Sequence, residues 1–212
     1  MKKLKCYVTM YNRLTWAKAY CEDLVKAGLE VILIDNNSDY PPLLEWYKNC
    51  PYEVIRMGGN HWAWVYFTHV RKPGDDRFVF VSDSDLDISK IPLDWPDVLM
   101  NGLVKNKVRA WKAGFSIELD DLPNNELTRA VLAHERPMWA QPQTPEGFYA
   151  SAIDVGLALY DFDFEGGTRG IGKPLWYDAI RAPRPYVLRH LDWYMTKENV
   201  TEEDLYYLST AT

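Results

Sequence analysis

The chain has 212 residues, 47% hydrophobic and 25% charged, a composition that excludes disordered and collagen-like proteins. Its 24 Lys and Arg against 30 Asp and Glu leave a net charge of −6, and no stretch concentrates the basic residues, so nucleic acid is not an expected partner. Three cysteines, Cys6, Cys21 and Cys50, lack metal-ligand spacing, which favours a reducing compartment.

The first residues are basic but run directly into a predicted strand, without the apolar segment or cleavage site of a signal peptide. No apolar run approaches the roughly 20 residues that a transmembrane helix needs. We therefore expect a soluble cytoplasmic protein, or one domain of a larger one. Aromatic residues make up 14% of the chain, and such side chains stack on sugar rings as well as filling cores.

The first 90 residues alternate between strand and helix patterns. Apolar, partly β-branched runs predict strands at residues 5–9, 30–34, 52–57 and 77–82. Helical spacing predicts helices at residues 16–27, ending at Gly28, and at 41–48 and 63–71. Strands separated by helices indicate a mainly parallel sheet, which binds its ligands at the carboxyl ends of the strands.

The pattern changes after residue 87. We expect a helix at 97–105, extended chain at 108–119, a helix at 126–135, a loop at 137–147 and a strand within 149–160. Residues 162–185 are rich in Gly, Pro and charge and predict a mobile loop that closes over a ligand. We expect one compact domain, 1–212, with a nucleotide-binding half, 1–90, and an acceptor-binding and catalytic half, 91–212.

An acidic segment follows the fourth predicted strand. Asp83, Asp85 and Asp87 occupy alternate positions, which places their side chains on one side if the chain stays extended. Carboxylates so close repel one another, and a hard divalent cation such as Mn²⁺ or Mg²⁺ relieves that repulsion. The alternative is an acidic turn that caps the next segment.

Polar residues also follow the first two predicted strands. Thr9, Tyr11 and Asn12 end the first, and Asp35 ends the second, at the same edge as Asp83. Tyr11 has a ring that can stack on a base, and Asp35 can accept a hydrogen bond from a ring N–H. The alternative is turn chemistry, because Asn and Asp favour loops and caps.

A third loop contains Gly58, Gly59 and Asn60, where glycine lets the backbone approach a ligand closely. The order of these parts resembles the nucleotide-sugar-dependent glycosyltransferases of the GT-A fold. In that family a Tyr-Asn loop, an acidic residue, a Gly/Asn segment and an Asp-x-Asp motif follow the first four strands. The tail at residues 189–194, with the acidic stretch and paired tyrosines after it, is similar to small bacterial and viral members, chlorella virus glycosyltransferase domains in particular.

The resemblance implies an α/β protein of the GT-A fold, with a Rossmann-like, mainly parallel nucleotide-binding sheet fused to a smaller acceptor-binding lobe. It implies transfer of a hexose or deoxyhexose from a UDP-sugar to a glycan, glycoprotein or other hydroxyl acceptor, with Mn²⁺ or Mg²⁺ as cofactor. Asp85 would bind the metal directly, Asp83 would reach the ribose and the metal, and His190 would complete the site. Arg181 and Arg184 would clamp the diphosphate.

An inverting transferase needs a carboxylate general base for the acceptor hydroxyl. Family position indicates Asp154, an acid within an otherwise apolar run. Asp161, Asp163 and Glu165 are rivals, and a structural carboxylate satisfied by partners is the alternative for Asp154.

Three other functions fit parts of the sequence. A phosphatase with an Asp-x-Asp motif expects a following Thr, whereas Leu86 and Asp87 stand there. A sugar nucleotidyltransferase expects a Gly-rich basic loop after the first strand, which Tyr11 and Asn12 do not provide. A nucleotide-sugar-binding module without turnover stays open, and turnover is what separates it from the enzyme.

Overall fold

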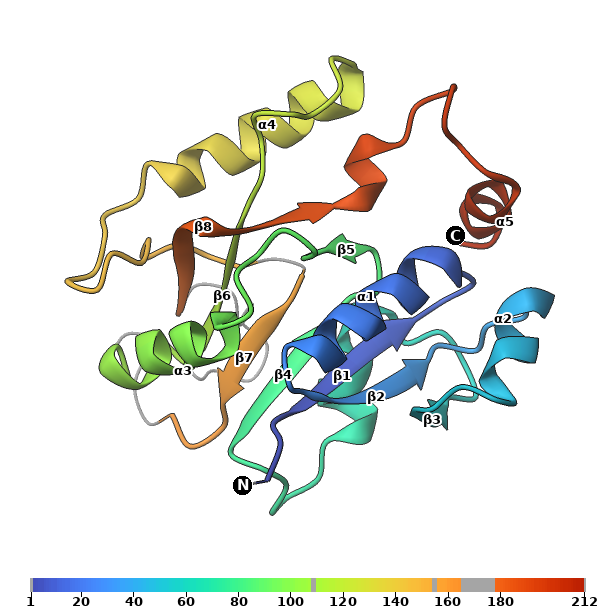
Figure 1. The fold of residues 1–212 in the computed structure, drawn as a ribbon, viewed down its shortest axis with the longest axis horizontal. Coiled ribbons are helices and arrows are strands. Elements are labelled where there is room, and N and C mark those ends of the chain that lie inside the picture. The colour runs from blue at the N-terminus through green and yellow to red at the C-terminus, as the bar shows by residue number, and fades with distance from the viewer. Residues whose placement is uncertain (1, 108–109, 154–155, 165–177, 212) are drawn as a thin grey trace.

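The computed structural model describes residues 2–107, 110–153, 156–164 and 178–211, and these form a mixed α/β fold around an eight-stranded sheet (Figure 1). The strand order is β3-β2-β1-β4-β7-β6-β8-β5. The strands are β1 (Lys5–Met10), β2 (Glu30–Asp35), β3 (Glu53–Arg56), β4 (Phe78–Ser82), β5 (Leu86–Asp87), β6 (Lys112–Ile117), β7 (Ala158–Asp161) and β8 (Ala179–His190). The α-helices are α1 (Thr15–Lys26), α2 (Pro41–Tyr47), α3 (Trp95–Lys105), α4 (Glu126–Trp139) and α5 (Glu202–Thr210).

The first four long strands form the parallel half of the sheet that the sequence predicts. β1 pairs in parallel with β2 and β4, and β2 pairs in parallel with β3. The predicted α1 ends as expected: Gly28 has a φ of +89° and its N–H donates to the carbonyl of Val25, which is the role of a glycine after a helix. All the parallel strands therefore end at one edge, where the polar loops follow.

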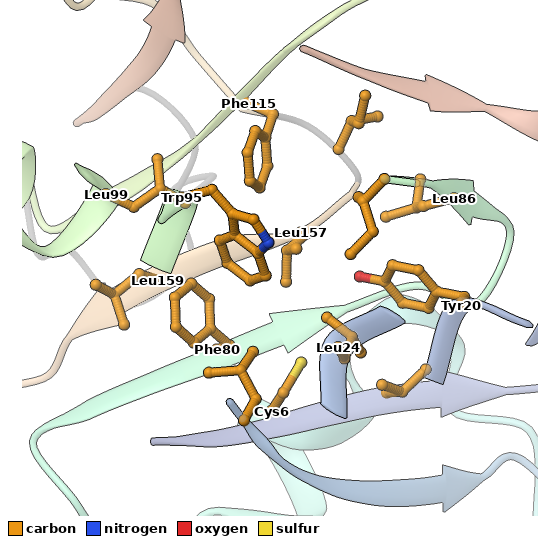
Figure 2. Packing of buried hydrophobic residues seen from close by; sticks show 14 of the residues in the cluster. Cys6, Tyr20, Leu24, Phe80, Leu86, Trp95, Leu99, Phe115, Leu157 and Leu159 are labelled. Atoms are coloured by element: carbon orange, nitrogen blue, oxygen red, sulfur yellow. The ribbon is translucent and has the colours of Figure 1, made fainter. Parts of the chain in front are cut away.

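The core lies on both faces of this sheet because side chains alternate along each strand. On one face α1 and α3 cover Cys6 and Phe80, and the indole of Trp95 lies between Phe80 and Phe115, with ring centroids 5.2 Å and 5.3 Å away (Figure 2). On the other face Val79 and Val81 belong to a second buried cluster. The sheet is thus anchored on both sides.

The second half of the chain continues the same sheet. β7 is antiparallel to both β4 and β6, while β8 runs parallel to β6 and antiparallel to β5. The pairing of β4 with β7 joins the two halves of the chain through backbone hydrogen bonds. None of the helices in the described residues is long and apolar enough to cross a membrane.

Three expectations need correction. The predicted loop at 162–185 is wrong from Ala179 onward, since buried Ile180 and Ala182 pair with β6. Among the described residues, the predicted strand within 149–160 is limited to β7 and two isolated bridges at Tyr149, to Gln143 and to Arg181. Residues 63–71 form a 3₁₀ turn, Trp62–Trp64, and a π-helical turn, Tyr66–Val70, rather than one α-helix. The segment at 166–172, predicted to close over a ligand, lies outside the described residues.

The helix predicted at 126–135 continues to Trp139, through a residue expected to stop it. Pro137 stands inside its last turn. The indole N–H of Trp139 donates to the carbonyl of Ile117 at 3.2 Å, and its ring packs edge-on against Tyr149 at 5.4 Å. These contacts hold the final turn in place despite the missing N–H of the proline.

Candidate functional site

A pocket of about 260 Å³ opens at the carboxyl ends of the parallel strands. Loops after β1, β2 and β4 form its floor, and the end of β8 and helix α5 form its far wall. The lining residues are Thr9, Tyr11, Arg13, Asn36, Asn60, Trp62, Ala63, Asp83, Ser84, Asp85, His190, Asp192, Tyr207 and Ala211. This is the edge at which a parallel α/β sheet binds ligands.

Three side chains form a candidate cation site within this pocket. Asp85, His190 and Asp192 each have a ligand atom within 4.8 Å of the others. Strand register brings them together, because Leu86 of β5 is opposite His190 of β8, and the N–H of Leu191 donates to the carbonyl of Asp85 at 2.8 Å. Carboxylate oxygen and imidazole nitrogen suit divalent cations such as Mn²⁺.

The histidine carries a second observation that points to a ligand. His190 is 8% exposed, and its Nδ1 atom is buried without a hydrogen-bond partner. Its Nε2 atom is 3.7 Å from Asp85 Oδ2, and its ring stacks on Trp193 at a centroid distance of 4.8 Å. A buried ring nitrogen left without a partner costs free energy. Nε2 is the nitrogen that faces Asp85, so it is the atom placed to ligate an ion together with that carboxylate. The group can therefore hold a metal ion.

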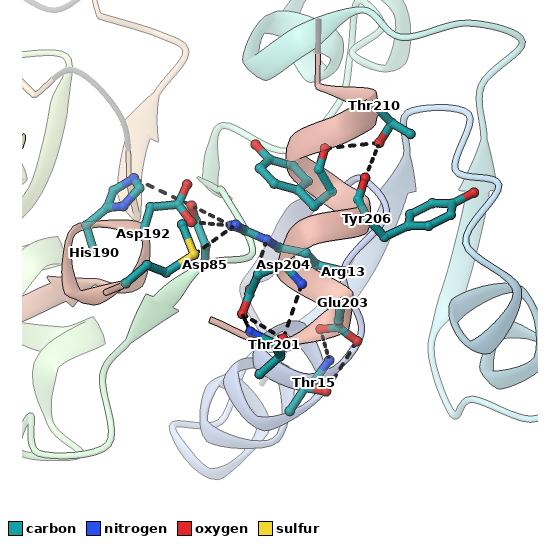
Figure 3. Close-up of polar contacts among 12 residues, drawn as sticks. Arg13, Thr15, Asp85, His190, Asp192, Thr201, Glu203, Asp204, Tyr206 and Thr210 are labelled. Atoms are coloured by element: carbon teal, nitrogen blue, oxygen red, sulfur yellow. Dashed lines mark hydrogen bonds and ion pairs between the residues drawn. The ribbon is translucent and has the colours of Figure 1, made fainter. Parts of the chain in front are cut away.

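Arg13 supplies positive charge to the same cluster (Figure 3). Its guanidinium donates a hydrogen bond to Asp192 and lies 3.7 Å from an oxygen of Asp85 and 3.9 Å from one of Asp204. The group is 2% exposed and lies 3.7 Å above the ring centre of Tyr207. Arg13 thus neutralises part of the acidic charge of the cluster.

Burial raises the pKa of Asp192 above its ordinary value. The neighbouring carboxylate of Asp85 raises this pKa further, and Arg13 and His190 lower it. The direction of the net shift shows that Arg13 does not fully offset the burial and crowding of these acids. A bound cation would favour the ionised form of Asp192 for the same electrostatic reason.

The predicted metal ligands are brought together only in part. Asp85 and His190 belong to the cluster, whereas Asp83 lines the pocket and its Oδ2 accepts from the N–H of Gly156 at 3.2 Å. The chain bends after β4, so the three acids do not share one extended face. Asp87 accepts from the N–H and hydroxyl of Ser89 and caps a turn.

Asp35 and Asn12, predicted to bind nucleotide, are buried and hold the loops together. Asp35 accepts from the hydroxyl of Tyr47 at 2.9 Å, and Arg56 lies 3.2 Å from its other oxygen. Burial and then Asp35 raise the pKa of Tyr47 above its ordinary value. Asn12 has a φ of +46°, and its amide oxygen accepts from the N–H of Asp39 at 2.8 Å. Neither Asp35 nor Asn12 lines the pocket.

The other predicted nucleotide contacts divide between pocket and scaffold. Thr9 lines the pocket with a buried hydroxyl that has no hydrogen-bond partner, and Tyr11 lines it while donating to the carbonyl of Thr210 at 2.9 Å. Asn60 lines it too, but Gly58 and Gly59 do not.

The two predicted arginine clamps lie away from the pocket. Arg181 is 2% exposed and pairs with Glu135 at 2.5 Å. Arg184 makes a two-pronged contact with Glu118 at 2.6 Å and 2.7 Å. Both side chains tie β8 to neighbouring elements and are not in position to hold a ligand beside Asp85 in this structure.

The candidate general base, Asp154, and its rival Glu165 lie outside the described residues. Asp161 is opposite Phe78, at the start of β4 and thus at the other edge of the sheet, where Arg77 donates to it at 2.8 Å and 2.9 Å. Asp163 lies 3.6 Å from the same arginine. Neither of these two rivals is near the pocket.

Eight residues that line this pocket were not among the predicted site residues: Arg13, Asn36, Trp62, Ala63, Ser84, Tyr207, Ala211 and Asp192. The His-x-Asp spacing of His190 and Asp192 was a usable signal for the last of them. Among the described residues, the buried side-chain polar atoms that lack a hydrogen-bond partner belong to Thr9, Arg13, Tyr66, Thr144 and His190. Three of these five line the pocket, which marks it as a site shaped for a ligand.

Comparison with known proteins leaves the family open. No protein-family model matches the chain, and no curated protein matches it. The functional argument therefore depends on the site itself.

Proposed function

We propose that this protein is a metal-dependent glycosyltransferase that moves a hexose or deoxyhexose from a UDP-sugar to a hydroxyl acceptor such as a glycan or glycoprotein. The observation that carries the proposal is the group of Asp85, His190 and Asp192 in a pocket at the carboxyl edge of a parallel sheet. The Asp-x-Asp resemblance and the α/β fold support it. The GT-A fold and the transfer reaction are parts of the proposal.

Each group has a stated task in this proposal. Asp85, His190 and Asp192 hold Mn²⁺ or Mg²⁺, and Asp83 orients the donor from the side of Gly156. The bound ion would neutralise the diphosphate of the donor and stabilise it as a leaving group. Thr9 offers its unpartnered hydroxyl to the nucleotide. Hydrogen bonds from fixed protein groups need no reorganisation during the reaction, which is why a rigid strand edge suits this task.

Asp154 stays the predicted general base for an inverting reaction. A base acts on the acceptor hydroxyl, whereas Asp85 and His190 act on the donor, so the two roles are separable by substitution. The alternatives are a nucleotide-sugar-binding module without turnover and a sugar nucleotidyltransferase. Release of UDP from a UDP-sugar in the presence of Mn²⁺ favours the transferase, and binding without release favours the module.

The first prediction tests the cation site by calorimetry of Mn²⁺ alone, and then of UDP in the presence of Mn²⁺ or EDTA. Asp85→Ala and Asp192→Ala should each weaken Mn²⁺ binding at least about tenfold, because each removes an oxygen ligand. UDP binding should weaken with it, because the diphosphate and Asp83 would otherwise face each other as like charges.

Asp87→Ala is the matched control, since that carboxylate lies two residues further on and caps a turn with Ser89. It should retain the affinity of the wild-type protein for both Mn²⁺ and UDP. Equal UDP affinity in Mn²⁺ and EDTA would remove the metal bridge from the proposal.

A further inference from the structure

Trp62 has a backbone conformation that bulky residues seldom adopt. Its φ is +59°, and it begins the 3₁₀ turn Trp62–Trp64 between β3 and β4. In this left-handed region the Cβ atom crowds the following carbonyl, so a non-glycine residue is strained there. Such strain persists only where surrounding contacts impose it.

A buried side-chain amide imposes this conformation. Asn36, which is 2% exposed, donates from Nδ2 to the carbonyl of Trp62 at 3.0 Å and accepts at Oδ1 from the N–H of His61 at 3.2 Å. Asn60 adds a third contact by accepting from the N–H of Trp62 at 3.0 Å. The turn is further supported by the packing of His61 against His69, with ring centroids 3.8 Å apart and the ring planes tilted by 35°.

The strained backbone conformation of Trp62 does not bury its indole. The side chain of Trp62 is 59% exposed, yet the residue lines the same pocket as the cation site. Three hydrogen bonds fix the backbone of the strained turn at His61 and Trp62, so a ligand must order only the two side-chain torsions of the exposed indole. This arrangement therefore adds little to the stability of the fold, but it holds an aromatic ring where a ligand in the pocket can contact it.

We propose that Trp62 is the stacking platform for the nucleobase of the donor. This inference rests on the proposed function, because it takes the diphosphate to lie at Asp85. The carbonyl of Trp62 is held at the end of β2 by Asn36, whereas Asp85 follows β4, and β1 lies between these strands. The ends of β2 and β4 are two strand spacings apart, about 10 Å. A nucleoside diphosphate has the length to span that distance, and a single pyranose ring does not.

One of the two groups first expected to contact the base is already occupied. Asp35 is fully buried beneath Tyr47 and Arg56, whereas Tyr11 lines the pocket while its hydroxyl donates to the carbonyl of Thr210. Stacking on an indole tolerates any base, because every base has a π-face. Trp62 therefore supplies affinity for the nucleotide and little selectivity among bases.

The test measures UDP binding by calorimetry, with Mn²⁺ present, in the wild-type protein and in three variants. Trp62→Gly should weaken UDP binding roughly ten- to a hundredfold, the range for loss of a base–aromatic stack. Its melting temperature should equal or exceed that of the wild type, because glycine adopts a positive φ without strain. Trp62→Phe should recover part of the affinity, since it restores an aromatic face.

Leu93→Ala is the control, because this side chain is also exposed, at 63%, and does not line the pocket of Asp85. It should bind UDP as the wild type does. Wild-type UDP affinity in Trp62→Gly would overturn the stacking role while leaving the proposed function intact.

Two other outcomes separate the inference from the function on which it rests. If the wild-type protein binds Mn²⁺ but neither UDP nor GDP, the nucleotide is wrong and both proposals fail. If methyl glycosides without a nucleotide bind, and Trp62→Gly abolishes that binding, the platform serves a sugar ring and the assignment to the base is overturned.

Discussion

Arg13 places a buried positive charge among the acids of the candidate cation site. Its guanidinium is buried against Tyr207 and faces Asp85, Asp192 and Asp204. Removing one partner from a buried ion pair is costly because the remaining charge is left uncompensated. A divalent cation at Asp85 and Asp192 can replace the lost charge.

Arg13→Met should therefore lower the melting temperature of the metal-free protein, and Mn²⁺ should raise it more in this variant than in the wild type. Thermal unfolding with and without Mn²⁺ measures both effects. Arg77→Met is the control, because its partner Asp161 lies at the opposite edge of the sheet. The Arg77→Met variant should lose stability, but Mn²⁺ should raise its melting temperature no more than it raises that of the wild type. An equal rise in the Arg13→Met and Arg77→Met variants would contradict the cation site at Asp85 and Asp192.

Polar residues at strand ends can either bind a ligand or stabilise their own loops, and the predicted site residues divide between these two roles. Asp83, Asp85 and His190 were predicted as ligands and all line the pocket. The two aspartates follow a strand that the sequence predicts, whereas His190 was predicted from the family resemblance alone. Asn12 and Asp35 occupy equivalent positions but turn inward to bind backbone and side-chain groups of the loops. A sequence does not reveal which way such a side chain turns, since turn chemistry and ligand chemistry use the same residue types.

Among the elements, β8 is the one that sequence reasoning missed most clearly. The four strands β1 to β4 could be predicted, because each is a short apolar run bounded by turn residues. β8 contains Pro183 and Pro185, which argue against a strand. The structure accommodates both prolines at an irregularity: Ala182 pairs with Phe115 while Val187 pairs with the next residue, so the residues between them carry no pairing with β6.

The irregularity in β8 is held by Arg184, which contacts Glu118 directly after β6. The hydrogen bonds from Arg184 hold the pKa of Glu118 at about 2, although burial opposes this shift. A carboxylate with a lowered folded-state pKa stabilises the fold above its unfolded pKa, and this stabilisation is lost as the pH falls. The window here runs from the ordinary value of 4.5 down to about 2.

Glu118→Gln should lower the free energy of unfolding at neutral pH by roughly 1–2 kcal/mol, less than full linkage implies because Arg184 is half exposed. The stability of the variant should also fall less steeply between pH 4.5 and pH 2. Urea unfolding across this range measures both. Asp120→Asn removes the other carboxylate that contacts Arg184. The side chain of Asp120 is 84% exposed, so this variant should lower the free energy of unfolding at neutral pH less than Glu118→Gln does.

At the scale of the whole molecule, helix α5 meets the loop that follows the first strand at the candidate site. Figure 1 shows α5 beside the arrowhead end of the parallel strands, and its residues contact the loop that follows β1. Tyr11 donates to Thr210, Asn12 donates to the hydroxyl of the same threonine at 3.0 Å, and Thr15 donates its N–H to Glu203 at 2.9 Å. The helix thus forms one wall of the pocket.

The contribution of α5 is local to that wall. The main buried cluster beside α1 and α3 contains no residue of α5, so the rest of the fold does not depend on it for its core. The helix supplies Tyr207 to the pocket and to Arg13, and it holds the loop from Tyr11 to Thr15. Removal of α5 should open the pocket and remove the contact of Tyr207 with Arg13, while the sheet stays folded.

A chain that ends after Val200 should therefore retain the far-ultraviolet circular dichroism of a folded α/β protein and a cooperative thermal transition. Its affinity for UDP with Mn²⁺ should fall at least about tenfold, because a wall of the site and the support of Arg13 are gone. Leu205→Ser is the matched control, since Leu205 is on the same helix and is 56% exposed. This variant should bind UDP normally, and normal binding by the shortened chain would show that α5 is no part of the nucleotide site.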